Sequence, residues 1–593
     1  MSRYLRASSS AFFSLSWPLW AILAVALVLA SCTGGTDQAQ LVDPAEAESP
    51  SESGDAETSA GVVEENGTPT APPATEPEGL AFADGPQTLR VSVPDLTELS
   101  PSELEETNAV HVLITDLLTD GLTRRNPVDG AIEPAVAESW TTSEDGLTWT
   151  FQLGDATFSN GDLIESDDVI ASLTLLAARG VNSVSAPNLW PVVGWTDAGE
   201  AAAENPTAQI QVSGITAPAD GQVQFELSEP FAPLAEILAS VSFGITPAEN
   251  TSDIIGSAVD FVIDEEWADG LRFSGAQVDG EISTIELLVD PNFSMFSAGE
   301  SDLAIGTVGI ELLPDGATQA DAQRSATSYF AMNAAVAPFD DPLIRQAIVH
   351  AIDADELLAG QFANVAPMRS FIPEQVAGGV ADACGDSCAL DIDQARTLVE
   401  ASPSREIEIE VDFFDEFSDV EDPEDGSELA VSFEEQLAET LAQSLSDIGL
   451  TVSTDGHTGE EFAAGVSSGE FGIFRFGSGS TTLSPESFIG LPFHTGGVDN
   501  ITSTSIERVD ALIDEARATT DDAERAALYA SAEQILFAEA VVVPLMEFRQ
   551  PFAFSQNLSS AGLEPDGSLD LAQIQFVADL SGESASELIP QGE

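Results

Sequence analysis

The sequence predicts an α/β fold, because segments with helical apolar periodicity alternate with short strand-like segments through its second half. Helices are expected at about 342–359, 391–401, 430–448, 505–518 and 521–540, and strands at about 407–413, 450–454, 471–476 and 541–548. The 593-residue chain is 43% hydrophobic, which is enough to fill several cores. No second long apolar run follows residue 31, so we expect the rest to form a soluble body.

The first half carries similar signals at wider spacing. An alternating strand is expected at 87–93 and a helix at about 108–118. The turn at 144–146 leads into a strand at 148–153, on which Trp149 and Phe151 share one face. A helix at about 166–178 and a strand at 222–227 follow.

The N-terminal segment has the layout of a secretory signal. Two arginines precede an apolar run from Ala11 to Ala30, and Leu29-Ala30-Ser31-Cys32 resembles the lipobox of bacterial lipoproteins. We therefore expect residues 1–31 to be a lipoprotein signal peptide and Cys32 to carry a lipid that anchors the protein to the cell membrane. The alternative is an uncleaved transmembrane anchor, since the run is nearly long enough to span a bilayer. Either arrangement places the body outside the cytoplasm, in the periplasm or at the cell surface.

The segment that follows is low in aromatic residues. Residues 33 to 85 are rich in Ala, Glu, Ser, Thr, Pro and Gly, and Phe82 is their one aromatic residue. Such a composition cannot bury enough apolar surface to fold. We expect residues 32–85 to be a disordered acidic tether between the lipid and the body.

The charge of the chain is strongly negative. Arginine supplies all 17 basic residues, against 102 acidic ones, for a net charge of −85. Nucleic acids and anionic lipid surfaces are therefore poor partners, because their binding needs clusters of Lys and Arg. We interpret the acidity as a means of staying soluble in a salty medium, and the alternative is a preference for cationic ligands.

Two further cysteines lie close together, in Cys384-Gly385-Asp386-Ser387-Cys388. A leftover pair in an exported chain typically forms a disulfide, which is our prediction here. A metal site is less favoured because no second Cys or His cluster lies nearby in the sequence.

Short motifs in a fixed order resemble those of one known family. They are PAVAESW at 134–140, DGLTWTF at 145–151, FSNG at 158–161, SDDV at 166–169, YFAMN at 329–333, PFDDPLIRQA at 338–347, AID at 351–353, DIGL at 447–450 and RAALY at 525–529. In these the chain resembles the family 5 extracellular solute-binding proteins, which are the dipeptide, oligopeptide and nickel receptors of ABC importers.

The resemblance implies a two-lobed periplasmic-binding-protein-like (type II) fold. The first lobe would span 86–330 and contain an extra subdomain at about 119–205. The second α/β lobe would span 331–540, and residues 541–593 would return to the first lobe and end in a C-terminal tail. The chain would cross between lobes near 327–334 and 540–550. The implied function is capture of a peptide or peptide-like solute, without catalysis or a cofactor, by a monomer that delivers it to a permease and its ATPase.

The resemblance also implies where the ligand binds. In peptide-binding relatives a second-lobe strand ends in Trp, and acids follow that can neutralise an ammonium group. Here Phe476 stands at the Trp position, and the acids are absent, with Ser484 at one such place. Glu486 is a displaced substitute. Ser478 and Ser480, in the Gly-Ser run, are candidates to hydrogen-bond a polar ligand.

Two arginines are candidates to bind a ligand carboxylate through paired hydrogen bonds. Arg475 adjoins the aromatic position, and Arg369 lies in a segment that lines the cleft in relatives. The alternative for each is a structural pair with one of the many acids. Without the missing acids, a receptor for a non-peptide polar solute is a second hypothesis.

A secreted serine hydrolase is the alternative from another class. Residues 465–469 match Gly-x-Ser-x-Gly, but that motif needs a strand before it and a helix after it. Here the expected order is reversed. The four histidines show no metal-ligand spacing, so no metal site is predicted.

Overall fold

The computed structural model describes residues 87–96, 108–126, 130–205, 207–248, 257, 261–267, 270–275, 282–309, 312–358, 364–404, 407–415, 432–558, 569 and 574–576. The predicted signal peptide, Cys32 and the acidic tether lie outside the described residues. Within the described residues, no helix combines the length and the apolar character that a membrane crossing requires.

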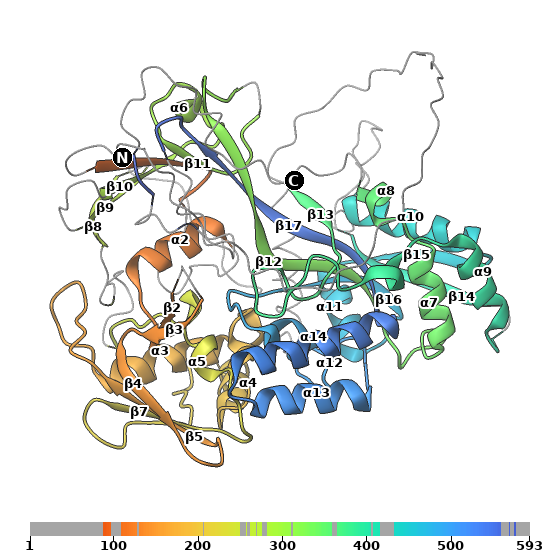
Figure 1. Cartoon of the computed structure of the whole chain (residues 1–593), viewed down its shortest axis with the longest axis horizontal. Helices are drawn as coiled ribbons and strands as arrows, with labels where there is room; N and C mark the ends of the chain where they lie inside the picture. The colour runs from red at the N-terminus through yellow and green to blue at the C-terminus, as the bar shows by residue number, and fades with distance from the viewer. Residues whose placement is uncertain are drawn as a thin grey trace, which may run out of the picture.

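One large mixed sheet runs through the molecule (Figure 1). Its order is β15-β14-β16-β12-β17-β11-β1-β10-β9-β8, and β13 adds to β17. The strands are β1 (Gln87–Val93), β8 (Phe261–Trp267), β9 (Gly270–Gly275), β10 (Ile282–Val289), β11 (Leu303–Ile305), β12 (Thr318–Met332), β13 (Val365–Pro367), β14 (Glu408–Phe414), β15 (Thr451–His457), β16 (Ile473–Gly479) and β17 (Val542–Phe554).

The first lobe is built around β1, which pairs in parallel with β10 and β11. Its helices are α2 (Ala109–Leu118) and the short α6 (Ser294–Ser297). The Asn108 side chain caps α2 by accepting the Val110 N–H at 2.9 Å. Leu89 and Val91 of β1 and Ile114 of α2 are fully buried in a shared core, so apolar burial holds the helix on the sheet.

Two long antiparallel strands join the lobes (Figure 1). β12 and β17 pair from Thr318 with Phe554 to Ala331 with Val542. At one end β17 pairs with β11 of the first lobe, and at the other β12 pairs with β16 of the second. These strands lie where the sequence analysis places the crossings, near 327–334 and 540–550.

A subdomain with its own core projects from the first lobe (Figure 1). Its four-stranded sheet has the order β4-β5-β7-β6, and β2 pairs with β3. The elements are β2 (Thr123–Arg125), β3 (Ile132–Pro134), β4 (Ala137–Thr142), β5 (Thr148–Leu153), α3 (Ser166–Arg179), α4 (Trp195–Glu204), β6 (Ile215–Thr216), β7 (Gln222–Glu226) and α5 (Leu234–Ile237).

The hairpin between β4 and β5 forms as its sequence predicts. Gly146 has a φ of +73°, a conformation that favours glycine, and its N–H donates to the Ser143 carbonyl at 2.9 Å. Phe151 is fully buried. The packed residues of the subdomain run from Leu122 to Ile245, further than the expected 119–205, because β7 returns to pair with β5.

The second lobe packs helices on the β14–β16 end of the sheet. They are α7 (Pro342–His350), α8 (Ala354–Leu358), α9 (Ile392–Ala401), α10 (Phe433–Asp447), α11 (Gly459–Ser468), α12 (Leu491–Phe493), α13 (Glu507–Ala518) and α14 (Asp522–Ala538). Asp341 caps α7 by accepting the Leu343 N–H at 3.0 Å, and Pro342 occupies its first position.

The single helix predicted at 342–359 is wrong in one respect, because it is two helices. α7 ends at His350, whose carbonyl accepts the Asp391 N–H at 2.9 Å instead of continuing the helix. The His350 ring is also engaged, with Nδ1 at 2.7 Å from the Ala389 carbonyl oxygen. A contact with a distant segment therefore overrides the local helical pattern.

Candidate functional site

The candidate site is the face of the sheet where β12 and β16 pair, next to the junction of the lobes. Tyr329 lies opposite Phe476, and Thr327 opposite Ser478. Cross-strand partners point to the same side of a sheet, and accordingly the Tyr329 hydroxyl lies 3.1 Å from Ser478 Oγ. We call these four residues the Tyr329 face.

The Tyr329 face has hydrogen-bonding capacity that the protein does not use. Thr327 Oγ1 is buried without a hydrogen-bond partner among the described residues, and the same holds for Ser325 Oγ and Ser484 Oγ. Burial of an unpaired hydroxyl costs free energy. The Phe476 ring is half-buried, so it keeps surface to offer. Sequence reasoning missed Thr327, although it lies two residues before Tyr329 in the motif at 329–333.

Ser480 lies just beyond β16 and extends the strand pairing. Its N–H donates to the Ser325 carbonyl at 2.9 Å, and its Oγ lies 2.9 Å from Thr482 Oγ1. The serines of the Gly-Ser run therefore follow one another where β16 and its pairing with β12 end.

Arg475 points to the opposite side of β16 from Phe476, as alternation along a strand requires. Its Nε donates to Glu434 Oε2 at 2.6 Å, its Nη2 donates to the other Glu434 oxygen, and its Nη1 donates to Ser328 Oγ at 2.9 Å. The guanidinium is buried. The structure thus places Arg475 in the structural pair that was its alternative.

Glu486 is fully buried at the start of a π-helical turn (Glu486–Gly490). It accepts from Arg517 Nη2 at 2.7 Å and from the Tyr529 hydroxyl at 2.6 Å. Burial opposes the charge on Arg517, but Glu486 outweighs burial and raises the pKa of Arg517. Burial, together with Glu486, raises the pKa of Tyr529. Glu486, Arg517 and Tyr529, which we call the buried ion-pair cluster, tie α13 and α14 to the turn.

Arg369 is half-exposed, and within the described residues its side chain makes no hydrogen bond or ion pair with the Tyr329 face. Its Nη2 donates to Asp355 Oδ2 at 2.8 Å, and both side chains are open to solvent. An exposed pair of this kind is weak. Of the sequence-predicted residues, the structure therefore brings together Phe476, Ser478 and Ser480.

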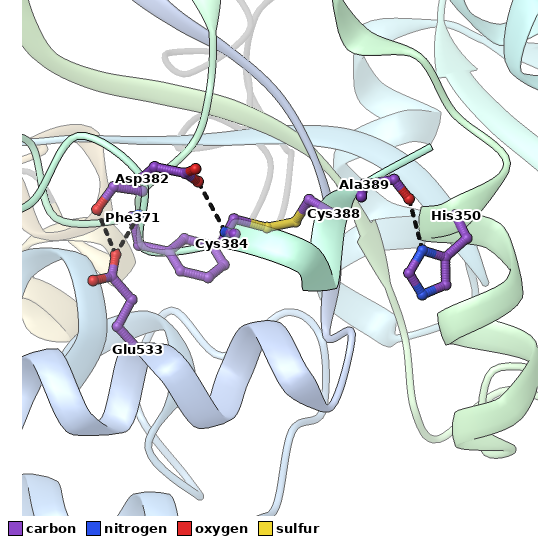
Figure 2. Close-up of a disulfide and its surroundings, with 9 residues drawn as sticks. His350, Phe371, Asp382, Cys384, Cys388, Ala389 and Glu533 are labelled. Atoms are coloured by element: carbon purple, nitrogen blue, oxygen red, sulfur yellow. Dashed lines mark hydrogen bonds between the residues drawn. A yellow bond between two sulfur atoms is a disulfide. The ribbon is translucent and has the colours of Figure 1, made fainter. Parts of the chain in front are cut away.

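The segment that carries Arg369 is held from two sides (Figure 2). The Arg369 carbonyl accepts the Cys384 N–H at 3.0 Å, and Cys384 forms a disulfide with Cys388. Figure 2 also shows the Glu533 carboxyl group at Phe371, whose N–H it accepts at 2.6 Å. Burial raises the pKa of Glu533, although these hydrogen bonds oppose the shift. The segment is a fixed wall of the second lobe.

The loop after β16 also contacts the subdomain. The hydroxyls of Ser185, Ser240 and Ser242 lie 2.8, 2.8 and 2.7 Å from Thr481 Oγ1. Nearby, Glu236 of the subdomain accepts from Arg525 Nη2 at 3.2 Å. The candidate site therefore adjoins a polar seam between the subdomain and the second lobe.

Features of other site classes are absent or misplaced. Among the described residues, no three His, Cys, Asp or Glu side chains come together as metal ligands. The Gly-x-Ser-x-Gly match lies at the end of α11 and precedes β16, which is the reverse of the hydrolase order. Its Ser467 Oγ donates to the Ala463 carbonyl at 2.7 Å, as a helix serine does.

Comparison with protein-family models shows to which family the chain belongs. The model described as "Bacterial extracellular solute-binding proteins, family 5 Middle" matches residues 131–269 and 290–500. The chain belongs to this family. The predicted membership is confirmed, and with it the two-lobed type II fold. The protein is a binding protein and not an enzyme, so the hydrolase alternative is discarded.

Individual relatives are distant but nearly full-length. The periplasmic oligopeptide-binding protein OppA of Escherichia coli (strain K12) is 23% identical over 511 residues, which are 80% of this chain and 89% of that protein. A nickel-binding periplasmic protein of the same strain is 23% identical over 466 residues, 70% of this chain and 81% of that protein. The unliganded open form of the murein tripeptide binding protein MppA superposes with a TM-score of 0.66 at 18% identity, covering 85% of this chain and 99% of MppA.

Proposed function

We propose that this protein is the substrate-binding component of an ABC importer, and that it captures a peptide or peptide-like solute between its lobes. The observation that carries the proposal is the Tyr329 face, where the half-buried Phe476 ring, the paired Tyr329 and Ser478 hydroxyls and the unpartnered Thr327 hydroxyl meet beside the strands that join the lobes. Its relatives OppA and MppA are named as oligopeptide- and murein-tripeptide-binding proteins, which supports the peptide class.

The joining strands supply the motion that capture needs. β12 and β17 connect the lobes, so bending of two strands would open and close them, as in periplasmic binding proteins. A ligand favours the closed state only through contacts that the open state lacks. Permease and ATPase subunits would then recognise the closed form of a monomeric receptor.

A lipid on Cys32 would hold the receptor at the membrane, with residues 32–85 as its tether. The lipobox-like sequence at 29–32 supports this part of the proposal. Replacement Cys32→Ser should move the protein from the membrane fraction to the soluble extracytoplasmic fraction. Retention of the variant in the membrane would instead favour an uncleaved transmembrane anchor.

A non-peptide polar solute is the second candidate. Ser484 stands where peptide-binding relatives have an acid, so the ammonium contact of those relatives cannot be made at that position. One relative is a nickel-binding protein, which indicates that ligand class varies among proteins at this distance.

Thermal unfolding against a ligand panel tests the proposal. The panel contains short peptides, sugars, polyamines, opines and divalent metals. A ligand at about a hundred times its Kd stabilises the folded state by about 2.7 kcal/mol, which a thermal shift detects. A shift with peptides supports the peptide class, and a shift with another class alone supports the second candidate. No shift with any member contradicts the receptor role.

A further inference from the structure

The polar seam between the subdomain and the second lobe contains a buried carboxylate. Glu236 of α5 accepts from Arg125 Nη2 of its own subdomain at 3.2 Å and from Arg525 Nη2 of α14 at 3.2 Å. Arg125 Nη2 also donates to the Leu483 carbonyl of the second lobe at 3.4 Å. Glu236 and Arg525 are both buried. Each side of the seam therefore supplies one guanidinium group that bonds to the other side.

Further contacts cross the seam. The Ala232 N–H donates to the Arg517 carbonyl at 2.7 Å. The guanidinium carbon of Arg517 lies 4.8 Å from the centre of the Trp190 ring, in a cation–π contact. Thr481 Oγ1 meets three serine hydroxyls of the subdomain. All of these partners belong to the chain itself, so the seam can form without a solute.

The chemistry of the seam suits a contact that can open and close. The buried apolar residues of the subdomain pack in a core that is separate from the two cores of the second lobe. The seam contacts named above are hydrogen bonds, ion pairs and a cation–π contact, and polar interfaces of this kind allow domains of one chain to move. A buried ion pair adds little net stability, because its charges must be dehydrated. Both charges regain their water when the seam opens.

The seam continues directly from the candidate site. Thr481 follows Ser480 in the loop after β16, and Arg125 bonds to the carbonyl of Leu483, two residues further on. The loop that begins at the Tyr329 face is therefore the same loop that the subdomain holds. Movement of the subdomain away from the second lobe would expose this loop.

We propose that Glu236 is a latch between the lobes, which holds the subdomain against the second lobe through Arg525 and must release before the lobes separate. The inference rests on the proposed receptor function, because it concerns the opening of the same lobes. The latch closes the receptor independently of the solute, and a solute enters during the openings. β12 and β17 then determine where the receptor bends, and Glu236 determines what fraction of the molecules is open.

Distances across the seam test the inference, and no solute is needed. Nitroxide labels are attached to the full chain in detergent solution through Glu204→Cys on α4 and Glu439→Cys on α10, both at exposed positions. Double electron–electron resonance then measures the distribution of distances between the labels. Protein without these two substitutions supplies the background, since Cys384 and Cys388 form a disulfide.

Two variants weaken the seam, and a third is the control. Glu236→Gln removes the carboxylate charge, while Arg525 keeps its contact with Asp522 at 2.6 Å, so α14 should stay folded. Thr481→Val removes the hydroxyl that the three serines contact and keeps the shape of the side chain. The control Glu133→Gln weakens an exposed ion pair, 3.9 Å long, that lies within the subdomain.

The wild type should give one main distance, that of the closed seam. Glu236→Gln should add a longer distance and raise the ratio of open to closed molecules about tenfold or more, as expected for loss of a charge-assisted contact. Thr481→Val should shift the distribution in the same direction by less, because the contacts that it loses are neutral. Glu133→Gln should match the wild type.

An unchanged distribution in Glu236→Gln, with or without a lower melting temperature, would overturn the inference, because the seam would then be a permanent structural contact. If Glu236→Gln does not fold, an unchanged distribution in Thr481→Val overturns it equally. A shift of the same size in Glu133→Gln would also overturn it, since the shift would not depend on the seam. None of these results touches the receptor function, which the ligand panel tests separately.

Discussion

Ser484 and Glu486 lie two residues apart and are both fully buried, yet within the described part of the chain only Glu486 has hydrogen-bond partners for its side-chain oxygens. Both oxygens of Glu486 are engaged, by Arg517 and by Tyr529. Ser484 Oγ has no partner among the described residues. The same difference separates the buried ion-pair cluster from Thr327 of the Tyr329 face, whose Oγ1 also has no partner among the described residues. We propose that charge that is complete within the fold belongs to the scaffold, and that polar capacity that is left over marks where a solute binds.

The comparison sorts the residues that sequence reasoning selected. Arg475 and Glu486 are bound to partners within the fold, so we assign them a structural role. Phe476 and Ser478 are only partly buried, and they remain our proposed ligand contacts.

Breaking the buried ion-pair cluster should have the largest effect on stability. Glu486→Gln leaves the buried Arg517 with only the longer ion pair to Glu229, at 3.7 Å, which should lower the free energy of unfolding by about 3–5 kcal/mol. Urea denaturation monitored by circular dichroism measures the change. Asp355→Asn breaks the exposed pair with Arg369 and should cost at most about 1 kcal/mol. Equal losses from the two variants would contradict the scaffold role.

Removing Arg475 should have the next largest effect. Arg475→Met removes charge-assisted hydrogen bonds to Glu434, and the loss should be about 1.5–3 kcal/mol. A double-mutant cycle with Glu434→Gln measures the coupling in the free energy of unfolding. Additive effects of the two substitutions would show that the pair is not coupled and would return Arg475 to the list of ligand contacts.

The disulfide should stabilise the folded state less than a disulfide between residues far apart in the sequence would. It closes a loop with a sequence separation of 4, and chain-entropy arguments give about 2 kcal/mol for so short a loop. The double variant Cys384→Ser, Cys388→Ser should lower the melting temperature by the same amount as reductant lowers that of the wild type. Ligand affinity should not change, since within the described part of the chain no hydrogen bond joins the Tyr329 face to this loop.

Asp412 provides a test that depends on pH. Burial raises its pKa to about 6, although His457 Nε2 at 2.9 Å opposes the shift. The folded state then holds this proton more tightly than the unfolded chain, whose Asp titrates near pH 3.9. The contribution of Asp412 to the free energy of unfolding should therefore fall as the pH rises from about 4 to about 6.

Asp412→Asn removes that titration, so the variant should gain stability relative to wild type over the same pH interval. Equilibrium denaturation at several pH values measures the difference. The exposed Asp455, which lies 3.9 Å from the same histidine nitrogen, supplies the control Asp455→Asn. A pH-independent difference between Asp412→Asn and wild type would refute the assignment.

Sequence reasoning located most second-lobe elements because their signals are local. The predicted helix at 505–518 is observed as α13 (Glu507–Ala518), and the strand at 407–413 as β14 (Glu408–Phe414). Strands β8 to β10 of the first lobe were missed, as was the full length of β12. The pairing of β1 with β10 joins residues about 200 apart, beyond the reach of a local pattern.

The site was predicted less completely than the fold, for a related reason. Phe476 and Ser478 were selected from the position of one strand, and their role in binding stays a prediction. The partner of Arg475 lies 41 residues away and that of Glu486 lies 31 residues away, so spacing did not indicate that either charge was already bound.

The distinction between structural residues and ligand contacts is tested most directly by calorimetric titration of Phe476→Ala and Arg475→Met. The titrant is the solute that gives the largest thermal shift. We predict that Phe476→Ala weakens binding about tenfold or more, as loss of a buried aromatic contact does, while its melting temperature stays close to that of the wild type. Arg475→Met should melt at a lower temperature and bind with unchanged affinity. The reverse result, with affinity lost in Arg475→Met and kept in Phe476→Ala, would contradict the account.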